Sequence, residues 1–171
     1  AEQRDAMSMS KLRKLDTCLK GQNKAFVAGV GGLFVKALRE AKSDLPKSEI
    51  MNALRVVGED MRQQPAQERV LFLISDMLEH SDYTSFYASD KISNLNVDKE
   101  LKLAGDKHLF ADLDQARVYV TGAGLVTDKV KHAYRSGKTM GLINDFWKNY
   151  FASSNASLMA FGAPSLNVDL H

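Results

Sequence analysis

The sequence predicts an α/β fold, with a small, mostly parallel sheet flanked by helices. Val70–Ile74 (VLFLI) is an unbroken apolar run of a length typical of a strand buried on both faces. A second run, Ala116–Thr121 (ARVYVT), is also strand-like and ends at a glycine-rich turn. Helical and strand patterns alternate along the chain, which indicates crossovers between parallel strands. With a weaker strand at 157–161, the sheet has about three strands and resembles half of a doubly wound fold.

The composition is that of one domain spanning 1–171, in which 1–45 is a helical N-terminal segment and 46–171 is the α/β portion. Hydrophobic residues make up 44% and charged residues 26% of the chain, which are ordinary values for a globular protein. The net charge of +2 gives no indication of a nucleic-acid partner. The single Cys18 excludes an internal disulfide and a cysteine metal cluster, so a reducing, cytoplasmic location is expected.

The N-terminal segment carries a helical pattern at 26–41, where Phe26, Val30 and Leu33 share one face. Each glycine within it weakens the helix by roughly 1 kcal/mol relative to alanine. The glycines and Lys36 also interrupt the apolar stretch, which falls short of the ~18 residues that a membrane span requires. We therefore expect no membrane-spanning segment.

Along the chain, helices are expected before, between and after the two strands. One begins at Ser48, which can cap it, and stops before Pro65. The pattern fades over 82–95, which predicts a loop, and a short helix is expected at 107–114. A last helix follows the turn SGKT. Its apolar face comprises Met140, Ile143, Phe146, Trp147, Tyr150 and Phe151.

Polar residues follow the first predicted strand directly, at the position where parallel sheets place ligand-binding groups. The alternative for Asp76 is a structural cap that accepts backbone N–H groups of the following turn. Aromatic residues in the same loop favour either packing or a protein-binding rim. The candidate ligand or partner residues are Ser75, Asp76, Glu79, His80, Tyr83, Gly122 and Gly124.

Several other motifs are incomplete. The SGKT turn resembles the end of a phosphate-binding loop, but His132 stands where that motif needs a glycine. Gly122 and Gly124 form half of a dinucleotide fingerprint, with Thr127 at the third glycine position. No G-x-S-x-G elbow accompanies the Ser, His and Asp side chains after the first strand. A capped helix and a tight turn are the simpler interpretations.

Three segments, VLFLISDMLEHSDYTSFY, ARVYVTGAGL and INDFWKNYFASSNA, together resemble divergent bacterial von Willebrand factor A-like domains. The resemblance covers roughly 48–161. It implies that the strand ending in Ser75 and Asp76 supplies an acidic corner of a metal-ion-dependent adhesion site. Ser48 lies where the family has a loop serine or threonine. The implied metal set is Asp76, Ser75 and Ser48, with Mg²⁺ as the cofactor.

The chain departs from the family pattern in one respect. The first strand of the family ends in D-x-S-x-S and supplies the central metal ligands, and no such motif occurs here. Either that strand lies outside this sequence or the domain has lost it. In the family the missing strand lies beside the equivalent of Val70–Ile74. We therefore expect another protein, an upstream segment or residues 1–45 to complete this sheet edge.

The function predicted from these features is a non-catalytic protein-interaction or scaffold module that uses the loops at the carboxyl ends of the strands. The alternative is a small α/β enzyme or nucleotide-binding protein with Asp76, Glu79 and His80 at its site. Neither a nucleophile–base pair nor a complete phosphate loop is visible, which favours the first function. An enzyme would need a deep pocket at the strand ends, whereas an interaction module can present a flat aromatic rim.

Overall fold

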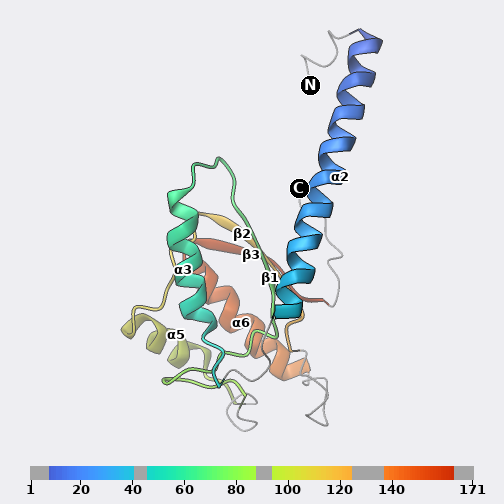
Figure 1. Cartoon of the computed structure of the whole chain (residues 1–171). Coiled ribbons are helices and arrows are strands. Elements are labelled where there is room, and N and C mark those ends of the chain that lie inside the picture. Colours follow the sequence, from blue (N-terminus) through green and yellow to red (C-terminus); the bar gives the residue numbers. More distant parts are fainter. Residues whose placement is uncertain (1–7, 41–45, 88–93, 125–136, 164–171) are drawn as a thin grey trace. The chain divides into compact units, whose positions relative to one another are not determined.

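The computed structural model describes residues 8–40, 46–87, 94–124 and 137–163 (Figure 1). The chain divides into two compact units, Ala1–Leu45 and Pro46–His171. The second unit is an α/β domain with an all-parallel sheet of three strands, so the predicted fold class is confirmed.

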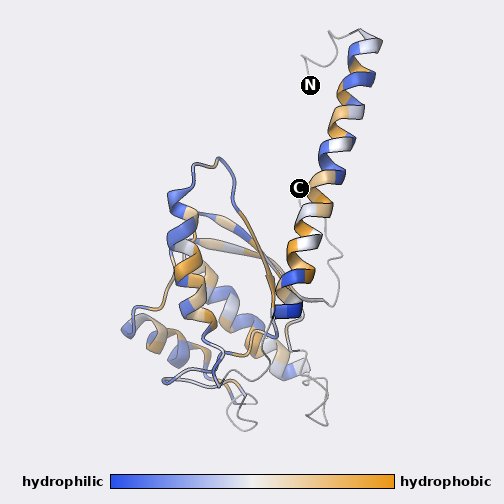
Figure 2. Cartoon of the chain, viewed as in Figure 1, coloured by the Kyte–Doolittle hydropathy of each residue, from blue (hydrophilic) through white to orange (hydrophobic). Residues whose placement is uncertain are grey.

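Within the described residues 8–40 of the first unit there is one helix, α2 (Met9–Glu40), of 32 residues. Residues 1–45 were predicted to be helical, with the clearest apolar pattern from Phe26 onward, and the described helix begins at Met9. Apolar and polar residues alternate along it (Figure 2), and the side chains of Phe26, Val30 and Leu33 are exposed. The predicted end of this helix, at residue 41, lies outside the described residues.

The sheet consists of β1 (Val70–Ile74), β2 (Ala116–Thr121) and β3 (Ala156–Ala163), in that order. The central strand, β2, is almost entirely buried, because it has a neighbour on each side. The pairing of β2 with β3 shifts register twice, whereas β1 pairs with β2 without a shift.

One expectation about β1 is wrong. We predicted a strand buried on both faces, but the side chains of Val70, Phe72 and Ile74 are exposed by 46%, 47% and 52%. The three exposed side chains share one face of the strand, whereas Leu71 and Leu73 on the other face pack against the core, so β1 is covered on one face only. It also lies at an edge of the three-stranded sheet, without a second neighbouring strand.

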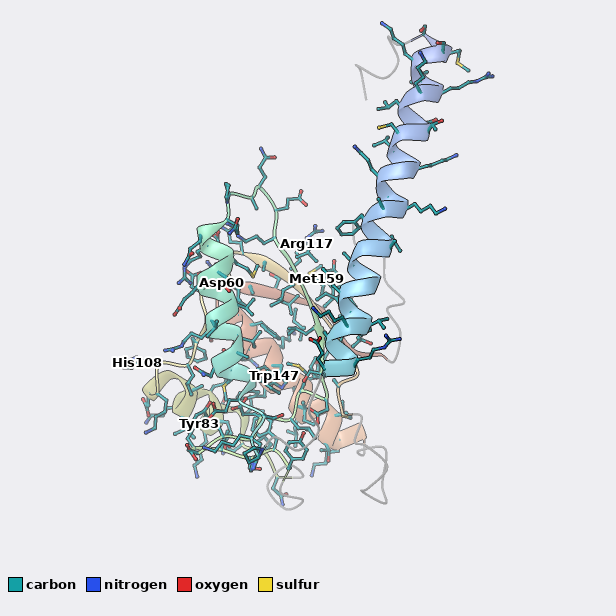
Figure 3. All side chains as sticks on the ribbon, in the orientation of Figure 1. Asp60, Tyr83, His108, Arg117, Trp147 and Met159 are labelled. Carbon is teal, nitrogen blue, oxygen red and sulfur yellow. The ribbon has the colours of Figure 1, made fainter. Side chains whose placement is uncertain are left out.

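Helices α3 (Ile50–Gln63) and α6 (Gly137–Ser153) share one hydrophobic core with the sheet. Helix α6 matches its prediction, because its aromatic face is buried. Phe146 and Trp147 pack at 5.1 Å between ring centroids, as do Trp147 and Tyr150. Figure 3 shows Trp147 in the interior of the α/β unit.

Helix α5 (Val97–Asp106) corrects a second expectation. A short helix is predicted from the sequence at 107–114, but that segment is non-helical, and the helix comes before it. Asn96 caps α5 by accepting a hydrogen bond from the Lys99 amide at 3.0 Å. In 107–114 the buried residues Leu109, Ala111 and Leu113 alternate with the half-buried Phe110 and the exposed Asp112, a period-two pattern that a helix cannot bury on one face.

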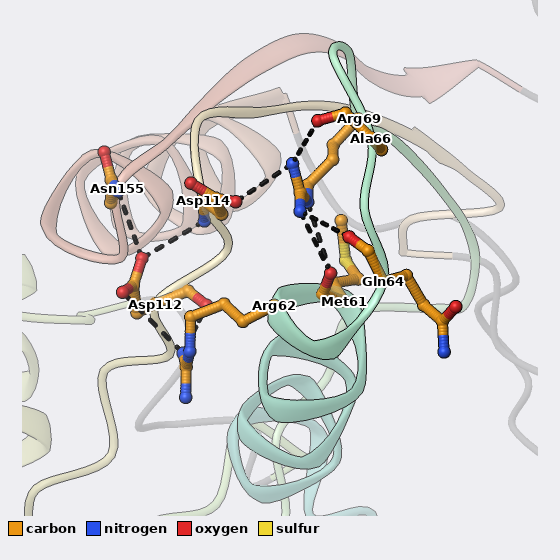
Figure 4. Close-up of polar contacts among 8 residues, drawn as sticks. All are labelled: Met61, Arg62, Gln64, Ala66, Arg69, Asp112, Asp114 and Asn155. Carbon is orange, nitrogen blue, oxygen red and sulfur yellow. Dashed lines mark hydrogen bonds and ion pairs between the residues drawn. The ribbon is translucent and has the colours of Figure 1, made fainter.

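Salt bridges and hydrogen bonds join the C-terminus of α3 to the start of β1 (Figure 4). The Arg69 guanidinium donates to the carbonyl oxygens of Met61, at 3.2 and 3.3 Å, and Gln64, at 2.9 Å. It also pairs with Asp114 at 2.9 Å. A guanidinium at this position satisfies carbonyls that a helix leaves without intrahelical partners. Arg69 therefore fixes the end of α3 against the sheet.

Asp112 forms the second half of this arginine cluster, which we define as Arg62, Arg69, Asp112 and Asp114. Its carboxylate accepts from the Asn155 side chain at 3.0 Å and the Asp114 amide at 3.1 Å. These hydrogen bonds, with the nearby Arg62 charge, lower the pKa of the Asp112 carboxyl below its ordinary value of 3.8.

Candidate interaction surface at the strand ends

The segment after β1, residues 75–87, forms the strand-end loop. Ser75 continues the ladder, since its amide donates to the carbonyl oxygen of Thr121 at 3.1 Å. Its hydroxyl accepts from the Met77 amide at 3.0 Å. Met77 has a φ of 57°, a left-handed conformation rare for a non-glycine residue, and its side chain is fully buried. Ser75 therefore stabilises a sharp turn out of the sheet.

Asp76 is engaged through three of its oxygens. One carboxylate oxygen accepts from the Leu78 amide at 3.0 Å, and the other accepts from the Tyr87 hydroxyl at 2.6 Å. The backbone carbonyl accepts from the Gly124 amide at 2.7 Å. Asp76 thus caps the turn, which is the structural alternative raised for it in the sequence analysis.

Glu79 has no exposed surface. Its carboxylate accepts from the Met51 amide and from the Tyr83 hydroxyl, both at 3.1 Å. Burial raises the pKa of the Glu79 carboxyl above its ordinary value of 4.5, against the opposing effect of these hydrogen bonds. The pKa of Tyr83 is raised to about 12, mainly by burial. Glu79 therefore anchors the loop to the start of α3.

The position of Glu79 also corrects the prediction for Ser48. We expected Ser48 to cap α3, but the N-cap residue is Glu49, and it makes no side-chain capping bond. Instead, the Met51 amide donates to the Glu79 carboxylate, which lies 28 residues further along the sequence. A carboxylate is favourable at this end of a helix because the helix dipole is positive there.

Ser48 and His80 lie together. The Ser48 amide donates to the His80 carbonyl at 2.9 Å, and the His80 amide donates to the Ser48 carbonyl at 3.0 Å. The His80 ring hydrogen-bonds through Nδ1 with the Ser85 hydroxyl at 2.9 Å. Its edge also meets the Tyr87 ring, with centroids 5.9 Å apart. The predicted residues Ser48, His80 and Asp76 are thus joined through one loop.

Gly122 and Gly124 form the turn after β2, with φ values of 85° and 75°. A side chain at Gly124 would come within 2.4 Å of the Met140 sulfur. Glycine is therefore required there both by backbone conformation and by the approach of α6. This is the tight turn that the sequence analysis gave as the alternative to a dinucleotide fingerprint.

A pocket of about 330 Å³ lies beside this turn. Asp76, Glu79 and His80 are not among the residues that line it. Its walls are mainly small or apolar residues, namely Ala123, Gly124, Met140, Gly141, Asn144, Phe161 and Gly162.

The metal set implied by the resemblance does not fit Mg²⁺ in this arrangement. The Ser75 hydroxyl and both carboxylate oxygens of Asp76 already accept hydrogen bonds. Ser48 reaches the loop through its backbone. Mg²⁺ requires a near-octahedral shell of oxygens. Within the described ranges, no group of three or more His, Cys, Asp or Glu side chains could hold a metal ion.

The ring side chains that remain accessible on this loop form an aromatic rim, which we define as His80 and Tyr87. Tyr87 is the more exposed of the two, at 39%, whereas Tyr83 packs against the core and donates to the buried Glu79. Phe86, between them in sequence, is fully buried and meets Phe146 at 5.1 Å between ring centroids. The aromatic residues of this loop, adjacent in the sequence, are thus divided between the core and the surface.

No protein-family model, curated protein or solved structure matches the chain. The von Willebrand A-like resemblance therefore stays a prediction. Over the part of the chain that the structure describes, no helix is long and apolar enough to cross a membrane.

Proposed function

We propose that the α/β unit is a non-catalytic protein-interaction module of von Willebrand A-like type, which binds its partner through the loops at the carboxyl ends of the strands. The observation that carries the proposal is the contrast within the strand-end loop. Its interior side is fixed by fully buried groups, and its outer side presents the aromatic rim.

A loop held in this way loses little conformational entropy on binding, which favours affinity. Met77, Leu78 and Phe86 fill the core beneath it, and Glu79 ties it to α3. Tyrosine and histidine combine an apolar ring with a polar atom, which suits a surface that is wet in the free protein and dry in the complex.

The alternative enzyme function would use Asp76, Glu79 and His80 as acid and base groups. Glu79 has no exposed surface, and a general acid or base must reach the proton that it transfers. The pocket at the strand ends has other walls. His132, Thr127 and Ser136, on which the nucleotide-binding motifs depend, lie outside the described residues.

The proposal can be tested with a photo-crosslinking amino acid placed at Tyr87 of the full chain in its source cells. The matched control carries the same amino acid at Met159, an exposed apolar residue on β3 that lies well away from Tyr83 in Figure 3. We expect a discrete protein adduct from position 87 and none from position 159. His80→Ala, which removes part of the rim, should reduce that adduct. Equal labelling at both positions, or no adduct at 87, would contradict the proposal.

A further inference from the structure

Two hydrogen bonds define which backbone groups of β1 face its neighbour. The Arg117 amide donates to the Arg69 carbonyl at 2.9 Å, and the Ser75 amide donates to the Thr121 carbonyl at 3.1 Å. In a parallel ladder, alternate residues direct their backbone groups to the same side. Val70, Phe72 and Ile74 therefore direct theirs away from β2. Among the described residues, no strand pairs with that outer side.

This edge lacks the features by which proteins protect exposed strands. Charges, prolines and bulges interrupt most free edges and prevent pairing with other chains. Val70–Ile74 contains no charge and no proline, and its pairing has no bulge. The opposite edge strand, β3, has two register irregularities and a glycine at 162 with φ of 91°.

We propose that the β1 edge pairs with β1 of a second copy of this chain, antiparallel, with Phe72 on the two-fold axis. Phe72 then lies opposite Phe72 of the second copy, and Val70 lies opposite Ile74. In such pairs each residue donates its N–H to the residue opposite and accepts one in return. The two faces of the interface are the same surface, as a two-fold axis requires.

The sequence of the edge suits this pairing because it is self-complementary. The outward residues are a β-branched residue, an aromatic residue and a β-branched residue, so reversing the strand leaves the pattern unchanged. Aromatic and β-branched cross-strand pairs are among the favourable ones. Each of these three exposed side chains would lie beside a side chain of the second copy on the same face of the joined sheet.

In this register Glu68 lies opposite Asp76 of the second copy, and like charges in that position weaken pairing unless each is engaged elsewhere. Glu68 pairs with Arg117 at 3.1 Å, and Arg69 pairs with Asp114 at 2.9 Å. The Asp76 carboxylate accepts hydrogen bonds from the Leu78 amide at 3.0 Å and the Tyr87 hydroxyl at 2.6 Å, so each of these charges is engaged within its own α/β unit. This surface is distinct from the aromatic rim, so the dimer does not depend on the function proposed above.

Sedimentation of the full chain over a range of concentrations tests the dimer. We expect the mass to rise from 19.0 kDa toward twice that value. Phe72→Lys should raise the dimer dissociation constant at least about tenfold, since a charge at a strand edge opposes pairing. Met159→Lys is the matched control, because Met159 is 50% exposed and lies on the other edge strand. Phe72→Thr keeps a residue that favours strands and should therefore stay folded. Circular dichroism of both variants shows whether a weaker dimer reflects lost pairing or lost folding.

A cysteine scan in the Cys18→Ser background tests the register. Paired residues in the proposed arrangement have Cα atoms about 5.5 Å apart, within the range of about 4.4–6.8 Å that a disulfide spans. Phe72→Cys should therefore give a disulfide-linked dimer on mild oxidation. Val70→Cys should not, because the two copies of residue 70 would lie about 13 Å apart along the strands.

A chain that stays monomeric at every concentration overturns the proposal. Hydrogen exchange of the monomer then shows whether the chain itself covers the edge. Slow exchange of the Val70, Phe72 and Ile74 amides would mean that it does. A dimer that Phe72→Lys does not weaken, or that cross-links at 70 but not at 72, overturns it as well.

Discussion

The two ends of β1 hold opposite ends of the same helix by opposite charges. Before the strand, the Arg69 guanidinium binds carbonyl oxygens at the C-terminus of α3. After the strand, the Glu79 carboxylate binds an amide at the N-terminus of α3. Both charges have the sign that the helix dipole favours. The surroundings differ, because Glu79 is fully buried and the arginine cluster reaches solvent. Burial, and not charge alone, should decide which contact matters more.

The largest effect is expected from Glu79→Ala. The substitution leaves the Met51 amide and the Tyr83 hydroxyl without their acceptor in the interior, at about 1–3 kcal/mol for each unsatisfied group. We expect the free energy of unfolding to fall by about 3 kcal/mol in urea titrations. The control is Glu59→Ala, because Glu59 is an exposed glutamate on α3. It should change the free energy of unfolding by less than about 0.5 kcal/mol. A loss under about 1 kcal/mol for Glu79→Ala would show that the anchor is dispensable.

At the other end, Arg69→Ala should cost less, about 2 kcal/mol by the same measurement. The freed carbonyls of Gln64 and Ala66 lie in exposed residues, where water can replace the guanidinium. Arg69→Lys should rescue little, since one ammonium cannot reproduce the forked set of hydrogen bonds. Arg55→Ala, an exposed arginine on α3, is the control. If Arg69→Ala costs more than Glu79→Ala, burial is not the deciding factor.

The pH dependence should distinguish the two ends by sign. The pKa of Glu79 is raised in the folded protein, so its contribution to stability is fully present below 4.5 and is lost as the pH rises through the folded value. Relative to Glu79→Gln, the wild-type chain should therefore become less stable between pH 4.5 and neutral pH. Parallel urea titrations of both proteins measure the difference. No divergence over that interval would contradict a raised pKa.

A smaller effect of the opposite sign is expected at the arginine cluster. The pKa of Asp112 is lowered, so its contribution is present above 3.8 and is lost as the pH falls below that value. The side chain is more than half exposed, and solvent screening keeps the contribution small. Asp112→Asn should therefore reduce the acid sensitivity of the unfolding midpoint slightly. A gain in acid sensitivity would contradict the lowered pKa.

The smallest effect is expected from Mg²⁺. Asp76 already accepts hydrogen bonds at both carboxylate oxygens, so adding Mg²⁺ should leave the thermal midpoint unchanged. Asp76→Asn in the absence of Mg²⁺ shows what the carboxylate contributes by itself. The substitution should lower the thermal midpoint slightly, because it weakens the hydrogen bonds from the Leu78 amide and the Tyr87 hydroxyl. A Mg²⁺-dependent rise in the midpoint that Asp76→Asn abolishes would restore the adhesion-site interpretation.

Elements with a strong local period could be predicted from the sequence. The apolar runs of β1 and β2 and the aromatic face of α6 gave the correct element types, because burial on one or two faces imposes those patterns. Helix α5 was missed, since its start depends on the side chain of Asn96 in a segment with little apolar periodicity. The edge position of β1 was expected only from the von Willebrand A-like resemblance, in which the strand beside it is missing, whereas its exposed face could not be predicted from the apolar run alone.

The positions of the candidate residues in the fold could be predicted, but their contacts could not. Ser75, Asp76 and His80 do lie together after β1, as the topology of parallel sheets requires. Their roles depend on partners distant in the sequence, such as Met51 for Glu79 and Gly124 for Asp76. No local pattern encodes those contacts, so a buried anchor and an exposed catalytic acid look alike in the sequence.

The bond between Trp147 and the strand-end loop gives the chain a built-in optical reporter. Trp147 is the only tryptophan, it is fully buried, and its indole N–H donates to the Met77 carbonyl at 2.8 Å. Its fluorescence therefore depends on whether this loop is seated. Any event that lifts the loop from the core would admit water to the indole and shift the emission to longer wavelength. Rearrangement beneath the rim could thus be followed in the unmodified chain, without an attached dye.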